Sequence, residues 1–368
     1  MRSVPPEFLP GIELSARLYR DAVRPLLSRH LPSLVHTAAL LGPGSEVLGF
    51  DTARSTDHNW GPRLHLFLRA DDLAASGETI SALLADQLPA TIAGYSTNLI
   101  AVDDQGTRHM RPANGRIQHA VVIAEPGDWL TGQLGFNPLA EITMLDWLAT
   151  STQALAEFTG GAVFHDGLDC LEPARRALAW YPDDLWRYVL ACQWQRLSQE
   201  EAFAGRCAEV GDDLGSAIVT ARLARDLTRL CLLIHRTYPP YSKWLGSAFA
   251  RLPCAGRLGP VLTAAVAATD WHDREEQLVA AYETVANLQN DLGLTAPVDP
   301  HVRFFHDRPY RVLHAERFTA ALLDTITDPV VRGLPLTGAI DQFADSTDAL
   351  AHRTRSRLLA EALYRPVQ

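Results

Sequence analysis

The hydrophobic periodicity of the chain changes once along its length, and this change constrains the fold more than any other feature. Before residue 126, short apolar runs, one of them alternating strictly with polar residues, predict strands. From Leu139 onward, apolar residues recur at helical spacing almost without interruption. The expected strands cover residues 37–42, 63–69, 95–103 and 117–125.

Turn residues at 135–138, Gly-Phe-Asn-Pro, separate the two parts. We therefore expect an α+β protein, with a small mixed α/β head at residues 1–136 and a helical bundle domain at residues 137–368. The expected helices cover residues 11–30 and 73–88 in the head, and 139–159, 173–198, 206–237, 241–252, 256–269, 273–292, 311–326 and 339–363 in the second part.

The charge balance argues against nucleic acid as a partner. The chain carries 43 acidic and 33 basic residues, a formal net charge of −10. It has no excess of cations to neutralise a phosphate backbone. An acidic surface is compatible with a cationic small molecule, although a mild net charge usually serves solubility alone.

Cysteine usage and hydropathy indicate a cytoplasmic protein. The N-terminal residues Met1 to Glu7 lack an apolar signal core, and no apolar run approaches the ~18 residues of a membrane-spanning helix. An odd number of cysteines with no Cys-x-x-Cys motif suggests reduced thiols. The five cysteines are Cys170, Cys192, Cys207, Cys231 and Cys254.

A Gly-Ser turn follows the first expected strand. The strand at residues 37–42 ends in Pro43-Gly44, after which Ser45 begins a turn. Free backbone N–H groups at such a turn suit a phosphate. Gly44 and Ser45 are therefore candidate nucleotide-binding residues.

A second polar motif stands immediately before the next strand. Asp57 and Asn59 are two residues apart, ahead of the alternating run that begins at Arg63. At strand spacing the two side chains would share one face. We expect them side by side, with Arg63 close by.

The order Gly44, Ser45, Asp57 resembles the pattern of the nucleotidyltransferase superfamily, which includes DNA polymerase beta and the kanamycin and streptomycin nucleotidyltransferases. The resemblance implies that Ser45 holds a phosphate of the nucleotide, that Arg63 assists it, and that Asp57 is a catalytic metal ligand. Asn59 stands where the family has a second carboxylate. An amide supplies one neutral oxygen, so Mg²⁺ should bind weakly or not at all.

The third acid of the family pattern normally stands on a later strand of the same sheet. The residue expected at that position is Val122. Glu125 is the only carboxylate on that strand, on the other face and about 10 Å further along. Asp103 and Asp104 fit a hairpin turn better, and Asp51 or Glu125 would have to move to replace the missing ligands.

Residues 194–252 form the informative block of the helical part. Its charged residues include Arg222, Arg225, Asp226 and Arg229, which share one helix face. Salt-bridged surface charges are the ordinary interpretation of such a face. The aromatic-rich segment at residues 238–246, Tyr-Pro-Pro-Tyr-Ser-Lys-Trp-Leu-Gly, is less easily explained in that way.

Together with the head motifs, this block resembles an uncharacterised bacterial family within the same superfamily. By analogy with kanamycin nucleotidyltransferase, a Glu of the helical part would deprotonate the acceptor hydroxyl. Glu201 is the first candidate and Glu200 the second. Tyr241 and Lys243 would bind the nucleotide, by stacking and as a point charge.

Three functions remain open from the sequence. The first is transfer of a nucleoside monophosphate from ATP or another nucleotide to a small-molecule hydroxyl, in a cleft between the two parts. The second is a binding or regulatory protein that kept the fold but lost catalysis. In the third, the same fold performs different chemistry in a biosynthetic pathway, since fold does not settle function.

Overall fold

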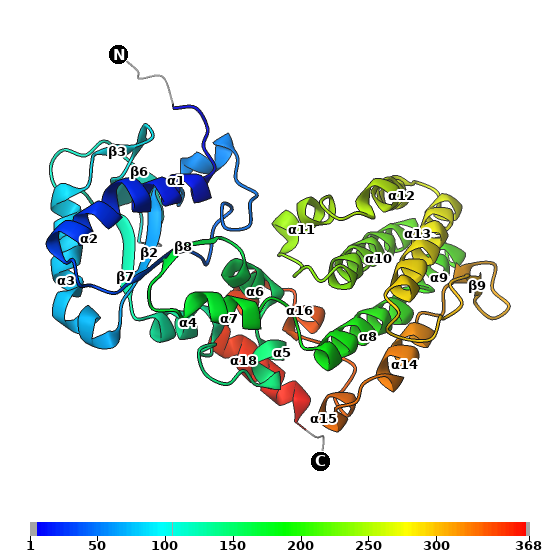
Figure 1. Ribbon diagram of the computed structural model, residues 1–368. Helices are drawn as coiled ribbons and strands as arrows, with labels where there is room; N and C mark the ends of the chain where they lie inside the picture. Colours follow the sequence, from blue (N-terminus) through cyan, green and yellow to red (C-terminus); the bar gives the residue numbers. More distant parts are fainter. Residues whose placement is uncertain (1–5, 105, 366–368) are drawn as a thin grey trace. The chain divides into compact units, whose positions relative to one another are not determined.

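The computed structural model describes residues 6–104 and 106–365. The chain divides into two compact units (Figure 1). The first comprises Met1–Ile142 and Ala154–Ala179, and the second comprises Thr143–Gln153 and Trp180–Gln368. Helices outnumber strands, and the α+β class expected from the sequence is confirmed.

A four-stranded mixed sheet with strand order β7-β2-β1-β8 forms the centre of the first unit. β2 pairs antiparallel with β1 and parallel with β7, while β8 pairs antiparallel with the other edge of β1. Of the four strands of this sheet, β1, β2 and β7 were predicted, within a few residues at their ends. The bounds are β1 (Thr37–Leu40), β2 (Arg63–Phe67), β7 (Ala120–Ala124) and β8 (Ala162–Asp166).

β8 is the strand that the periodicity did not predict. It lies beyond the expected boundary at residues 136/137, between two helices. Thr37 Oγ1 donates to Asp166 Oδ1 at 2.8 Å, which ties β1 to the end of β8. Because β8 completes the sheet, the chain returns to the first unit after residue 153, and a single crossing near residue 136 does not describe the division.

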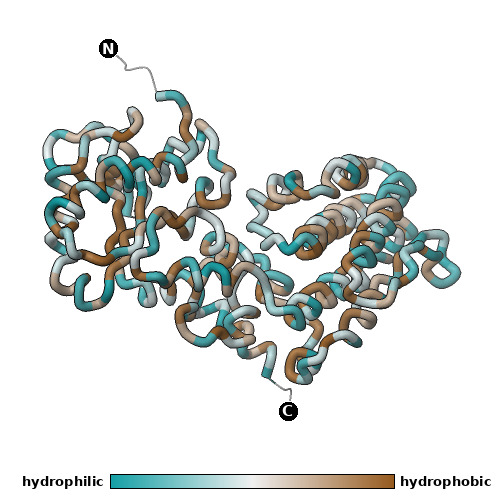
Figure 2. The backbone as a smooth tube through the Cα atoms, in the orientation of Figure 1, coloured by the Kyte–Doolittle hydropathy of each residue, from teal (hydrophilic) through white to brown (hydrophobic). Residues whose placement is uncertain are grey.

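The two faces of β2 have different environments. Leu64 and Leu66 belong to the hydrophobic core beneath the N-terminal helices. On the opposite face, the Trp129 ring lies 4.5 Å from His65 and 5.3 Å from Phe67, measured between centroids. Burial lowers the pKa of His65 to about 3, so the imidazole is neutral at physiological pH. In Figure 2 the central strands are among the most hydrophobic segments of this unit.

Helices and two small hairpins complete the first unit. The expected strand at residues 95–103 is divided between the two hairpins, and Asp103 Oδ1 accepts from Thr107 N at 2.9 Å in the turn of the second hairpin, as predicted for that segment. The helices are α1 (Gly11–Arg17), a π-helical segment (Leu18–Val23), α2 (Arg24–His30), a 3-10 helix (Ala53–Asp57), α3 (Ala70–Gln87), α4 (Pro126–Leu134), α6 (Thr152–Thr159) and α7 (Leu171–Ala177); the hairpins are β3 (Thr91–Ile92) with β4 (Tyr95–Ser96), and β5 (Leu99–Ala101) with β6 (Arg108–Met110).

The second unit is almost entirely helical. The helix predicted at residues 311–326 begins only at Glu316, because Arg311 and Val312 pair with a short strand instead. The elements of the second unit are α5 (Met144–Ala149), α8 (Asp183–Glu200), α9 (Phe203–Glu209), α10 (Asp213–Ile234), α11 (Ser242–Phe249), α12 (Ala255–Ala267), α13 (Trp271–Asp291), β9 (Arg303–Phe304), β10 (Arg311–Val312), α14 (Glu316–Asp324), α15 (Pro329–Arg332), α16 (Ile340–Phe343), α17 (Thr347–Ala351) and α18 (Arg353–Tyr364).

α8 and α10 form the centre of the second unit. α8 packs against α14 and α10, and α10 packs against α13 and α12 (Figure 1). Trp194 of α8 stacks on Phe318 with 4.4 Å between ring centroids, and its Nε1 donates to Gln289 Oε1 at 3.1 Å. Trp186, also on α8, is buried as well, and its Nε1 donates to Leu233 O at 2.9 Å. Within the described residues, no helix combines the length and apolarity needed to cross a membrane.

Candidate functional site

The turn after β1 offers two free backbone donors. Val47 N donates to Gly44 O at 3.2 Å and Phe50 N to Ser45 O at 2.8 Å, which closes the turn. Within residues 6–104 and 106–365, the N–H groups of Ser45 and Glu46 donate to no acceptor. Ser45 is partly exposed, so an anion can reach the turn at this residue, whereas Glu46 is buried.

An ion pair lies against the same turn. Nη2 of Arg63, the first residue of β2, donates to Pro43 O at 3.0 Å and to the carboxylate of Glu46, which is 2% exposed. A Cβ on Gly44 would stand 2.5 Å from Arg63 Nη2, so a larger residue there would require the Arg63 and Glu46 side chains to shift. Gly44, Ser45 and Arg63 are thus brought together as expected, but Glu46, which was not predicted, balances the charge of Arg63.

Asp57 and Asn59 do not share a strand face, and this expectation was wrong. Asp57 is the last residue of a 3-10 helix, whose start is fixed by a capping box between Thr52 and Ser55. Its carboxylate is 68% exposed and Oδ1 lies 2.9 Å from His58 Nδ1. The local preference for a capped turn overrides the extended conformation that two-residue spacing suggested.

Asn59 has a structural role. Its φ is 49°, in the left-handed region that asparagine tolerates. Its N–H donates to Arg108 O and its Oδ1 accepts from Arg108 N, both at 2.8 Å. The side-chain oxygen that could face a cation is therefore engaged with β6.

The other acids considered as metal ligands are also engaged. Asp51 Oδ2 accepts from Gly11 N at 2.7 Å, at the start of α1, and from Trp60 Nε1 at 3.0 Å. Glu125 caps α4 by accepting from Asp128 N at 2.6 Å. Val122 is 44% exposed and contributes no donor oxygen.

These residues do not fit the Mg²⁺ that the resemblance implies. Hard cations require several oxygen ligands that converge on one point. Among the described residues, no group of three or more His, Cys, Asp or Glu is placed to hold a metal ion. Asp57 retains an exposed carboxylate, but one ligand is too few.

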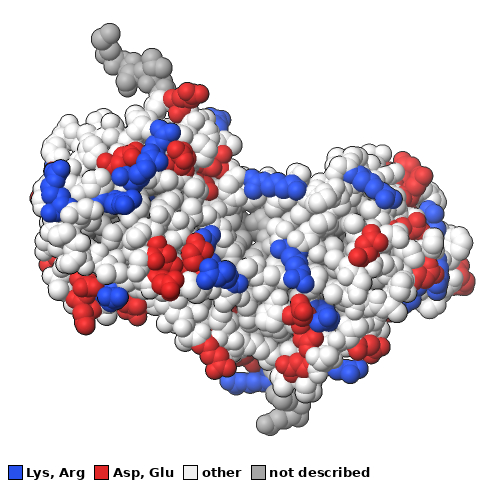
Figure 3. Space-filling view, in the orientation of Figure 1, with Lys and Arg blue, Asp and Glu red and all other residues white. Residues whose placement is uncertain are grey.

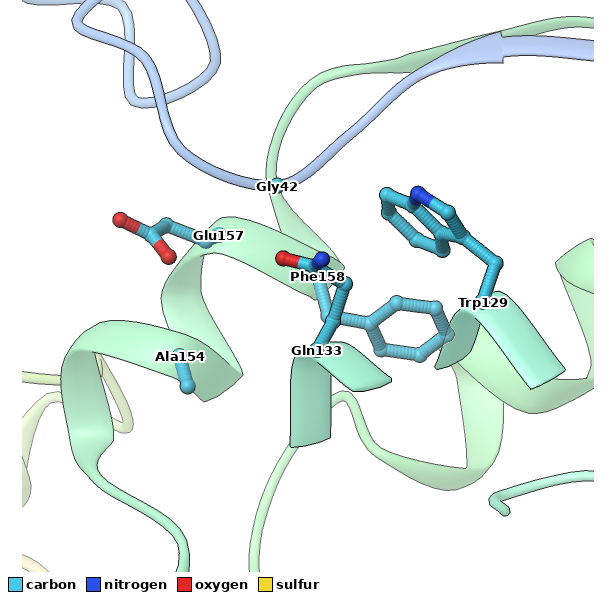
Figure 4. Close-up of a pocket in the computed structure, with 6 residues that line it drawn as sticks. All are labelled: Gly42, Trp129, Gln133, Ala154, Glu157 and Phe158. Carbon is cyan, nitrogen blue, oxygen red and sulfur yellow. The ribbon is translucent and has the colours of Figure 1, made fainter. Parts of the chain in front are cut away.

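A small recess lies on the Trp129 side of the first unit (Figure 4). Gly42, with φ of 80°, brings the end of β1 against Trp129 and donates its N–H to Glu157 O at 2.9 Å. The cavity volume of the recess is about 10 Å³, which is room for about one water molecule. Pockets for small molecules usually measure ~300–1,000 Å³, so this recess does not accommodate a nucleotide. Its lining residues are Gly42, Trp129, Gln133, Ala154, Glu157 and Phe158.

Glu201, the first candidate for a general base, is buried in the second unit. It is 7% exposed, and its carboxylate accepts from Leu313 N at 2.7 Å and Ala315 N at 3.0 Å. Burial raises its pKa to about 7. A pKa near 7 would suit a base, but both oxygens already bind backbone. Glu200, the second candidate, forms an ion pair with Arg222 at 2.7 Å.

Tyr241 and Lys243 lie at the start of α11. Tyr241 N donates to Gln153 Oε1 at 3.0 Å. Lys243 is exposed, with its ammonium 4.8 Å from the centroid of the Trp244 ring. An exposed cation and aromatic residues on one turn are compatible with a nucleotide contact, which stays a prediction.

The charged face of α10 is largely salt-bridged. Arg225 Nη1 lies 3.3 Å from Asp345 Oδ2, and Arg196 Nη2 lies 3.2 Å from Asp226 Oδ2. Asp226 is buried rather than solvated. On the face of the molecule that Figure 3 shows, acidic and basic side chains are interspersed in both units.

Comparison with known proteins covers part of the chain. Residues 147–245 match the family model described as "Domain of unknown function (DUF4037)". This segment contains Glu200, Glu201, Tyr241 and Lys243 but does not include the Gly44-Ser45 turn. No curated protein matches the chain.

Proposed function

We propose that this chain is a nucleotidyltransferase-like protein that binds a nucleotide phosphate at the Gly44-Ser45 turn and has lost metal-dependent transfer. The observation that carries the proposal is the contrast between the two motifs of the head. The turn keeps two unpaired N–H groups, whereas the polar side chain of Asn59 is engaged with Arg108.

The phosphate contact would rely on backbone donors. Two adjacent N–H groups form a concavity that suits an anion without a charged side chain. Arg63 adds a cation beside the turn, but Glu46 compensates it. We therefore expect an affinity that depends on the geometry of the turn more than on net charge.

Transfer to an acceptor hydroxyl is the less favoured function. That reaction needs a base near the hydroxyl and stabilisation of the charge that develops on the transferred phosphoryl group. Asp57 is exposed beside His58, and both oxygens of Glu201 accept from backbone. Glu201 is therefore not free to act as the base, and Asp57 alone provides no cation to stabilise the developing charge.

Calorimetric titration of ATP into the full chain tests the proposal, once with Mg²⁺ and once with EDTA. We expect binding of similar affinity in both, because the donors of the turn need no metal. Ser45→Pro removes one backbone donor and should weaken binding by at least about tenfold. Ser45→Ala keeps that donor and serves as the matched control, with circular dichroism to verify folding.

Two results would overturn the proposal. Mg²⁺-dependent release of pyrophosphate that disappears in Asp57→Ala would establish transfer chemistry instead. Absence of ATP binding under both conditions would exclude the nucleotide and leave a fold used for different chemistry.

A further inference from the structure

A row of apolar side chains on the second unit faces solvent. Among the described residues, Val210 and Leu214 are the most exposed large hydrophobic side chains, at 80% and 72%, and Ile218 is 60% exposed. Single exposed apolar side chains are normal on a protein surface, but these three recur every four residues. They extend from the end of α9 along the first half of α10. The proposed nucleotide site uses none of them.

The exposed face of α10 has the spacing of a seam between two helices. Leu214, Ile218, Ala221 and Arg225 follow one another at intervals of four, three and four residues. Residues at these intervals lie along one face of a helix and are the ones that contact a second helix. α10 packs against α8, α9, α12 and α13 with its other faces. Leu214, Ile218 and Ala221 therefore stay exposed.

The sizes of the side chains along this seam favour an antiparallel partner of the same sequence. If two copies of α10 pack antiparallel about a two-fold axis near residues 217 and 218, Leu214 of each copy lies opposite Ala221 of the other. A large side chain then fills the space beside a small one, and the two Ile218 side chains meet at the axis. A parallel pair would instead place Leu214 on Leu214 and leave a gap between the two Ala221 residues.

The charges at the two ends of the seam favour the same arrangement. The N-terminal end carries the exposed Asp212 and Asp213, and Asp213 forms no ion pair with a described residue. The other end carries Arg222 and Arg225, whose side chains retain 45% and 33% exposure beside their own acidic partners. Antiparallel packing brings the acidic end of each copy to the basic end of the other, whereas parallel packing would bring like charges together.

We propose that a second copy of this chain docks on α10, with the two helices antiparallel across Leu214, Ile218 and Ala221. The interface is isologous, because each copy contributes the same residues. Stable interfaces comprise roughly 20–30 residues on each side, and this seam is much smaller. The dimer therefore forms reversibly, with a dissociation constant on the order of micromolar.

Sedimentation velocity of the full chain over a series of concentrations measures this association. We expect a monomer at low concentration and a shift to dimer as the concentration rises. Leu214→Glu and Ile218→Glu should each weaken the dimer at least about tenfold, because they place like charges opposite each other in the seam. Leu358→Glu is the matched control, since Leu358 is 59% exposed on the helix α18 and lies outside the seam. It should associate like the wild type.

Cross-linking then tests the direction of the two helices. The variants are made with Cys207→Ser, because Cys207 is partly exposed. Ile218→Cys should form a disulfide-linked dimer under mild oxidation. Leu214→Cys should not link to itself, since antiparallel packing separates the two copies of this residue by about 10 Å along the helix axis, too far for a disulfide. A mixture of Leu214→Cys and Ala221→Cys should link.

Three results would overturn the proposal. A wild-type chain that stays monomeric up to concentrations of several hundred micromolar would show that no second copy covers the seam. An equal loss of association in Leu358→Glu would show that the contact lies elsewhere. Efficient cross-linking of Leu214→Cys to itself would establish a parallel arrangement. Circular dichroism of each variant verifies that it is folded, and these exposed positions contribute little to the core.

Discussion

Glu201 should make the stability of the chain depend on pH in a direction opposite to that of most carboxylates. Burial raises its pKa from 4.5 to about 7. The folded state therefore binds the proton more tightly than the unfolded state. The stabilising effect of this proton is complete below pH 4.5 and is lost as the pH rises to about 7. That interval corresponds to about 3 kcal/mol of unfolding free energy.

Glu201→Gln removes the titration while retaining the shape of the side chain. Its amide oxygen can accept from only one of Leu313 N and Ala315 N, because the NH₂ group has no lone pair to offer the other. The unpaired backbone donor should cost about 1–3 kcal/mol. We expect the variant to be clearly less stable at pH 4.5, and this deficit to shrink by about 3 kcal/mol toward pH 8.

Urea unfolding followed by far-ultraviolet circular dichroism, in steps from pH 4.5 to 8, measures this difference. Glu200→Gln is the matched control, because Glu200 is an adjacent glutamate in a partly exposed ion pair with Arg222. Its effect should stay below about 1 kcal/mol at every pH. Wild-type and Glu201→Gln curves that run parallel would refute the argument and place the Glu201 carboxylate in a solvated environment.

Two further predictions concern the head. Asn59→Ala should destabilise it by about 1 kcal/mol, whereas Asn59→Asp should be nearly neutral, because aspartate also accepts from Arg108 N and tolerates a positive φ. Urea unfolding of both variants tests this. If residue 59 merely lay in an exposed loop, both variants would be as stable as the wild type. Arg63→Ala should lower the free energy of unfolding by about 3 kcal/mol, because it leaves the carboxylate of Glu46 buried without its partner. Arg69→Ala, at an exposed arginine, is the control. An equally small loss of stability in both variants would show that the ion pair contributes little.

The strands of the head were predictable where the residues on the two faces of the strand alternate in the sequence and pack in different environments. β2 alternates Leu64 and Leu66 toward the core with His65 and Phe67 toward Trp129, and this pattern is visible in the sequence. β8 has no such alternation. All its side chains are intermediate or exposed, and it is placed by pairing with β1, a contact that local sequence does not reveal.

The candidate site was predictable only in part, for a related reason. Gly44, Ser45 and Arg63 come together because they flank the ends of two paired strands. Asp57 and Asn59 lie in the loop that precedes β2. The conformation of this loop is determined by the capping box of the 3-10 helix and by the positive φ of Asn59. Spacing arguments assume regular backbone, and they fail where side chains hydrogen-bond to nearby backbone instead.

The structure also explains why adding carboxylates would not by itself rebuild a metal site. Val122 is paired in register with His65 on β2, and 44% exposure means that an acid there would remain solvated. An aspartate at position 59 would keep the bond to Arg108 N. Asp57 would still face His58 at the end of the 3-10 helix. The acids would then occupy three separate local environments, whereas cation binding depends on oxygens that converge. The backbone between Asp51 and Trp60 therefore matters to any convergence of these oxygens as much as the identity of the side chains does.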